Sequence, residues 1–96
     1  MSPRYEFAIP AAEELLKSPV LTPEIAKQAL DIVTRARKHG ADWVDAWKAK
    51  SLKLQGLAHE ALGDLRAAVD AFDEALALDP KIGVKRKRDS LFKKLG

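Results

Sequence analysis

The sequence contains no cysteine, no long apolar run and no leader-like N-terminus, and each absence excludes a class of protein. Without cysteine the chain can form neither a disulfide framework nor a thiolate metal site or nucleophile. No apolar run reaches the roughly 18 residues that a membrane-spanning helix needs. The N-terminus lacks the basic segment followed by an apolar segment that marks a secretion signal. We therefore expect a cytoplasmic protein with no membrane segment.

The composition that remains is typical of a folded domain. The chain has 96 residues, of which 47% are hydrophobic and 32% are charged, and these proportions separate globular chains from disordered ones. A chain of this length builds one small domain that buries roughly 60% of its unfolded surface.

Charge is distributed unevenly along the chain. Residues 1–80 carry ten Lys and Arg against thirteen Asp and Glu, a net charge of −3. Residues 81–96 carry seven Lys and Arg against Asp89 alone, a net charge of +6. A basic segment at one end of a chain is typical of an interaction element.

The residue pattern predicts an all-α fold, because no segment shows the alternating β-branched residues of a strand. Prolines open or end helices. They divide the chain into an N-terminal arm over 1–21, with a short helix over 10–17, and a helical domain over 22–96. We expect the arm to lie against this domain, so that the whole chain is one compact unit. The apolar residues of the arm are Tyr5, Phe7, Ile9, Leu15 and Leu16.

Two helices are predicted ahead of the most regular part of the chain. Thr22 is a good N-cap, Pro23 suits a first helical turn and Gly40 can supply a left-handed stop, so the first helix lies between them. Asp42 can cap a second helix over 43–62. At about 100° per residue this second helix is apolar on two opposite sides, which predicts a helix with neighbours on both.

The most regular segment runs from Leu52 to Pro80. Its small and large residues alternate at the spacing that packs two antiparallel helices around a tight turn. Gly56 and Ala68 permit close approach, and Phe72 fills the gap between the helices. The full pattern consists of Leu52, Gln55, Gly56, His59, Gly63-Asp64, Ala68, Phe72, Ala75 and Pro80. The segment resembles a tetratricopeptide repeat over about 49–82.

This resemblance implies both a fold and a role in protein recognition. The fold is an antiparallel helix–turn–helix unit of the α–α superhelix type, with the flanking helices as caps. The last of these helices is expected over 84–95. Members of the family bind a peptide or a protein on the concave face, which the first helix of the repeat lines. By position that face consists of Lys50, Lys53, Leu57, Glu60 and Ala61.

The segment departs from the family pattern at Gln55 and His59, where larger apolar residues are usual. One subgroup of the family grips a partner's C-terminal carboxylate with a Lys and an Asn one helical turn apart. Lys53 matches the Lys, but Leu57 replaces the Asn, so this specificity is not carried over.

The sequence contains no group of residues suited to catalysis or to a metal. His39 and His59 have no cluster of further ligands beside them. We interpret His39 as favoured by a helix C-terminus and His59 as a packed neutral side chain. The carboxylates between Asp70 and Asp79 follow the outer side of one helix and do not converge across a cleft. We therefore predict no catalytic residue, no metal ligand and no cofactor.

Two tryptophans offer a second contact region. Trp43 and Trp47 are four residues apart and share a helix face. Either both pack onto the preceding helix, or one stays exposed as an anchor for a partner or for a second copy.

The last predicted helix has an apolar stripe and a basic patch. The stripe, which should face inward, consists of Val84, Leu91, Phe92 and Leu95. The patch consists of Lys85, Arg86, Lys87, Arg88, Lys93 and Lys94. Three interpretations stay open: a solvated face whose charge suits a helix C-terminus, a site for an acidic protein partner, and a nucleic-acid site.

Together these features favour a non-catalytic adaptor that docks a partner protein or peptide on the helix bearing Lys50, Lys53 and Leu57. The basic last helix would attract acidic partners to it. The first alternative is a homo-oligomeric assembly domain, such as a homodimer, because one repeat is fewer than such folds usually stack. The second alternative is nucleic-acid binding through residues 81–96.

Overall fold

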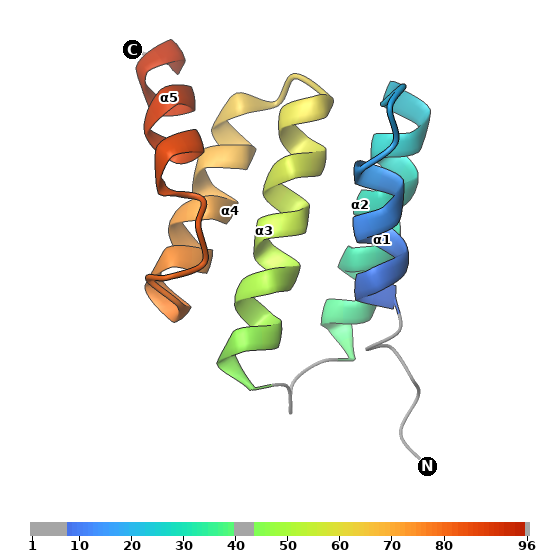
Figure 1. The fold of residues 1–96 in the computed structure, drawn as a ribbon, viewed down its shortest axis with the longest axis horizontal. Helices are drawn as coiled ribbons and strands as arrows, with labels where there is room; N and C mark the ends of the chain where they lie inside the picture. The colour runs from blue at the N-terminus through green and yellow to red at the C-terminus, as the bar shows by residue number, and fades with distance from the viewer. Residues whose placement is uncertain (1–7, 40–43, 96) are drawn as a thin grey trace.

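The computed structural model describes residues 8–39 and 44–95, and these residues form helices and no strand. The helices are α1 (Ala8–Leu16), α2 (Pro23–Lys38), α3 (Asp45–Ala61), α4 (Leu65–Leu78) and α5 (Lys85–Leu95). Each helix contacts the next along the chain, and α1 also contacts α3. In Figure 1 they stand side by side, with α5 and α4 on one side of α3 and the α1/α2 pair on the other. The all-α prediction is confirmed.

α2 begins where the sequence predicts. The Thr22 hydroxyl accepts a hydrogen bond from the N–H of Ile25 at 3.2 Å, and Pro23 occupies the first turn. The helix ends at Lys38, and the predicted stop at Gly40 lies outside the described residues.

α1 lies against α2 and α3 and completes a first core cluster. It begins at Ala8, ahead of the predicted start at Pro10, and Ile9 and Ala12 are fully buried. Leu15 and Leu16 pack against the same cluster, as predicted. Its other buried members are Ala29, Val33 and Leu54. Tyr5 and Phe7 lie outside the described residues.

α3 is packed on two sides, as its apolar pattern predicts. Leu54 belongs to the first core cluster, with residues of α1 and α2. Gly56 faces Phe72 of α4, and Leu57 packs against both the first cluster and a second one on the α4 side.

The predicted start of α3 is wrong. The helix begins at Asp45 instead of Trp43, and its N-cap is Val44, which makes no side-chain capping hydrogen bond. Val44 has an extended backbone (φ −66°, ψ 159°) and is exposed. Its carbonyl accepts the N–H groups of Trp47 and Lys48 at 3.0 and 3.1 Å. A β-branched residue favours extended backbone, so the helix starts after the valine. The predicted cap, Asp42, lies outside the described residues.

The turn between α3 and α4 has the geometry that the sequence predicts. Gly63 has φ +84°, which favours glycine. The N–H of Gly63 bonds to the Glu60 carbonyl at 3.0 Å, and that of Asp64 bonds to the His59 carbonyl at 2.9 Å. This pair of bonds is a Schellman motif. The Asp64 carboxylate then caps α4 by accepting the N–H of Ala67 at 3.2 Å.

α3 and α4 approach closely at Gly56. A Cβ added there would lie 2.6 Å from Cδ1 of Phe72, closer than real Cβ contacts allow. The Phe72 ring is fully buried, as are Ala68 and Ala75 on the same helix. The predicted roles of Gly56 and Phe72 are therefore confirmed.

The predicted inward stripe of α5 is correct for two of its residues and wrong for the others. Val84 and Leu91 are buried in the second core cluster, with Val69 and Phe72. Phe92 is 53% exposed and Leu95 is 36% exposed. The reason is that, among the described helices, α5 packs mainly along α4, so only a narrow strip of its surface is covered.

Replacing Gly56 with alanine tests the close approach of α3 and α4. Alanine favours a helix over glycine by about 1 kcal/mol, but its Cβ would overlap the buried Phe72 ring. Because overpacking costs roughly 1–3 kcal/mol, we expect Gly56→Ala to lower the free energy of unfolding in urea. In a Phe72→Leu background the same change should raise it. A gain in both backgrounds would contradict the contact.

Candidate functional site

The five residues predicted to form the partner-binding face all lie on one side of α3. Ala61 is exposed, and the other four are half-buried. We call this surface the α3 face; it consists of Lys50, Lys53, Leu57, Glu60 and Ala61. In Figure 1 it belongs to the helix that stands in the middle of the stack, between α4 and the α1/α2 pair.

Ion pairs link the α3 face to the helices on either side. Lys50 Nζ lies 3.5 Å from Glu13 Oε2 on α1. Glu60 Oε1 lies 3.0 Å from Lys87 Nζ on α5. All four side chains are partly exposed, so these pairs contribute little to stability. The pairs place side chains of α1 and α5 beside the α3 face. Because Lys87 is paired with Glu60, it is not an unpaired cation of the predicted basic patch.

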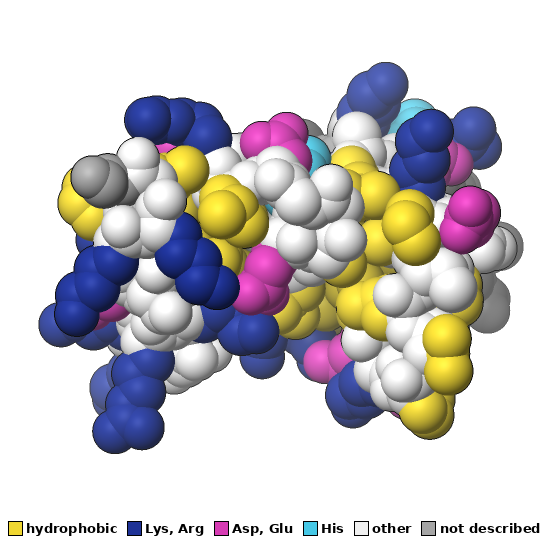
Figure 2. All heavy atoms as spheres, turned by 90° about the horizontal axis from the view of Figure 1, so that it is seen from above, with side chains coloured by type: hydrophobic (Ala, Val, Ile, Leu, Met, Phe, Trp, Pro, Cys, Tyr) yellow, Lys and Arg dark blue, Asp and Glu magenta, His cyan; other side chains and the backbone are white. Residues whose placement is uncertain are grey.

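A hollow of about 320 Å³ opens beside the C-terminal half of the α3 face. Its apolar lining comes from α1, the α1–α2 loop and α3, and its charged lining residues are the Glu60–Lys87 pair. The lining residues are Leu16, Leu21, Leu57, Glu60, Ala61 and Lys87. Figure 2, which views the molecule from above, shows apolar side chains gathered from the centre to the right and Lys and Arg gathered at the left, over α5.

Lys53 is the cation of the α3 face that stays uncompensated. It is half-buried, and no ion pair involves it within residues 8–39 and 44–95. Lys53 does not line the hollow, but Leu57, which does, lies one helical turn further on.

Of the two tryptophans, the structure describes one. Trp47 is 38% exposed and, with Ala46 and Lys50, lines a small hollow of about 170 Å³. Trp43 lies outside the described residues. Trp47 is therefore partly accessible, and its role as an anchor for a partner stays a prediction.

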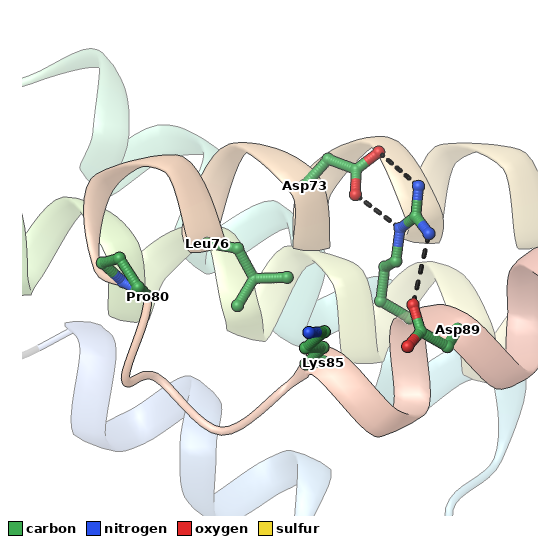
Figure 3. A pocket seen from close by; sticks show the side chains of 6 residues that line it. Asp73, Leu76, Pro80, Lys85 and Asp89 are labelled. Atoms are coloured by element: carbon green, nitrogen blue, oxygen red, sulfur yellow. Dashed lines mark hydrogen bonds and ion pairs between the residues drawn. The ribbon is translucent and has the colours of Figure 1, made fainter.

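Arg88 of the basic patch is engaged within the chain. Its guanidinium donates to Asp73 at 2.6 Å and to Asp89 at 3.2 Å, and it stacks over the Phe92 ring at 4.6 Å. Figure 3 shows the two carboxylates on either side of it. The hydrogen bond to Asp73, and then that to Asp89, raise the pKa of Arg88 above its ordinary value. Lys87 is exposed but paired with Glu60, so the residues of the patch that are exposed and make no ion pair among the described residues are Lys85, Arg86, Lys93 and Lys94.

The helix dipole explains only the C-terminal half of this patch. Lys93 and Lys94 lie in the last turn of α5, where positive charge is favourable. Lys85 and Arg86 lie in the first turn, which has no acidic residue and where positive charge is unfavourable. The interpretation of the patch as a face that suits a helix C-terminus is therefore incomplete, and the acidic-partner and nucleic-acid interpretations stay predictions.

The described residues offer no arrangement for a metal. No three His, Cys, Asp or Glu side chains of residues 8–39 and 44–95 lie close enough together to hold an ion. His59 is half-buried on α3, and His39 is the C-cap of α2. In the same part of the chain, none of the helices is apolar over a length that could cross a membrane.

Sequence reasoning missed the contributions of α1 and of the loop after it to this site. Glu13 of α1 pairs with Lys50, while Leu16 of α1 and Leu21 of the loop line the hollow. The position of Glu13 in a short apolar helix indicates that the helix is amphipathic. It does not indicate which residue Glu13 pairs with, because Lys50 lies far away in the sequence.

Comparison with known proteins agrees with the geometry. A scan against protein-family models matched residues 49–82 to the family described as Tetratricopeptide repeat. Searches of curated proteins and of solved structures matched nothing. Tetratricopeptide repeats generally mediate protein–protein interactions and are generally non-catalytic. The matched segment contains most of α3, the Gly63-Asp64 turn and α4. Residues 49–82 are therefore a tetratricopeptide repeat, flanked by α1, α2 and α5.

Proposed function

We propose that the protein is a non-catalytic adaptor that docks a segment of a partner protein on the α3 face. The observation that supports this most directly is the apolar hollow, one of whose lining residues, Leu57, lies one helical turn from the unpaired Lys53. A hollow with an apolar lining suits one large apolar side chain, and a few placed polar groups orient what enters it.

The arrangement favours a partner segment with a particular chemistry. An apolar side chain of the partner would enter between Leu16, Leu21 and Leu57. A carboxylate one turn or a few residues away would reach Lys53, the one cation of the face that no described carboxylate neutralises. Lys50 already faces Glu13, so it would contribute less to an acidic partner. The cytoplasmic location expected from the sequence stays a prediction.

Reversing the charge of Lys53 tests the electrostatic part of this proposal. We expect Lys53→Glu to lower the affinity for the bound partner about tenfold, the effect of losing roughly 1.4 kcal/mol. Lys27→Glu on α2 is the matched control, because Lys27 is exposed, has no ion pair among the described residues and undergoes the same charge change. The measurement is the amount of partner protein that each variant captures from nuclease-treated host extract. An equal loss of capture by both variants would contradict docking on the α3 face.

Site-specific photo-cross-linking tests the location of the partner. A benzophenone amino acid placed at Ala61, which is exposed and lines the hollow, should link to the partner in cells. The same amino acid at Ala77 is the control, because Ala77 is equally an exposed alanine but lies on α4. A heterologous protein linked through position 77 and not through position 61 would contradict docking on the α3 face.

A further inference from the structure

The edge of the molecule formed by α4 and α5 presents both a hollow and an exposed aromatic ring. The hollow, of about 350 Å³, has an apolar floor of Leu76 and Pro80 (Figure 3). Its charged walls come from Asp73, Lys85, Arg88 and Asp89. Phe92, 53% exposed, stands beside it, since its ring is stacked on Arg88. We call the hollow together with Phe92 and Leu95 the α4/α5 edge.

An exposed ring and an apolar hollow on one surface are self-complementary. A phenylalanine side chain buries roughly 150–250 Å² when it is enclosed, and nothing in residues 8–39 and 44–95 encloses Phe92. When two identical surfaces meet about a twofold axis, each ring faces the hollow of the other copy. Such an interface closes on itself and stops at two copies.

The charges around the α4/α5 edge are also self-complementary. The exposed charges of α4 are acidic except for Arg66: the acidic ones are Asp70, Asp73 and Glu74. The exposed charges of α5 are basic except for Asp89: the basic ones are Lys85, Arg86, Lys87, Lys93 and Lys94. The Arg88–Asp73 pair shows that a base of α5 and an acid of α4 already match within one copy.

The unfavourable charges of the first turn of α5 support the same arrangement. Lys85 and Arg86 repel the positive end of the helix dipole and have no carboxylate partner among the described residues. Carboxylates brought by a second copy would offset this repulsion. An interface that matches opposite charges gains specificity and association rate more than affinity, whereas the Phe92 ring would supply the buried anchor.

We propose that a second copy of this chain docks on the α4/α5 edge. In the resulting twofold dimer Phe92 of each copy enters the hollow over Leu76 and Pro80 of the other. The carboxylates of α4 in one copy face the basic residues of α5 in its partner. The hollow beside the α3 face has a different lining, so the dimer and the adaptor function occupy separate surfaces.

Sedimentation equilibrium of the full chain over about 1 µM to 1 mM tests the dimer. We expect the wild-type chain to dimerise, and Phe92→Glu to raise the dissociation constant at least about 30-fold, as loss of a hot-spot residue does. Val20→Glu is the matched control, because Val20 is 70% exposed and lies on the α1–α2 loop. A monomeric wild-type chain, or equal weakening by both substitutions, would overturn the proposal. Circular dichroism confirms that each variant is folded.

A charge-swap experiment distinguishes this dimer from any other self-association. One variant carries Asp70→Lys and Glu74→Lys, and the other carries Lys85→Glu and Lys93→Glu. Alone, each variant brings like charges together and should dimerise at least about tenfold more weakly than wild type. Mixed in equal amounts they should form heterodimers close to wild-type strength. A mixture as weak as its components would rule out pairing of α4 with α5.

Discussion

The contact between Gly56 and Phe72 is the constraint on which the rest of the structure depends. The Phe72 ring is fully buried and occupies the space that a side chain at position 56 would need. α3 and α4 can therefore pack closely along a line of small residues, and the Schellman turn at Gly63 brings the chain back at the required spacing. Because one side of α3 is used in this way, its other apolar side is left for α1 and α2.

This two-sided packing determines where a binding face can be. Leu54 and Gly56 take part in contacts on opposite sides of α3, so the binding face is confined to a strip of the helix between them. That strip contains Lys53 and Ala61, and its hollow is completed by side chains from outside the repeat. The flanking helices thus do more than cap the ends, because Leu16 from α1 and Lys87 from α5 shape the surface that a partner would meet.

Local signals in the sequence predict well the parts of this fold that local interactions determine. The start of α2 forms as predicted, because Thr22 supplies the capping acceptor and Pro23 suits the first turn. The turn before α4 also forms as predicted, because Gly63 adopts a positive φ and Asp64 supplies the capping acceptor. The errors arise where a distant neighbour decides the outcome. Periodicity alone placed Phe92 and Leu95 inside, but among the described helices α5 packs mainly along α4, and both residues are exposed. The residues proposed for the α3 face share one side of α3 because helical spacing requires it, whereas the Glu13–Lys50 pair depends on tertiary packing.

The separation of charge along the chain is better explained by association than by stability. Two of the bases in the last helix pair with carboxylates of α3 and α4, and exposed pairs of this kind contribute little to the free energy of folding. Lys85 and Arg86 lie where the helix dipole disfavours them. A stable capping helix would place acidic residues there instead. The exposed charge is mainly basic on α5 and mainly acidic on α4, and such a pattern gives a partner with the complementary charges a preferred orientation.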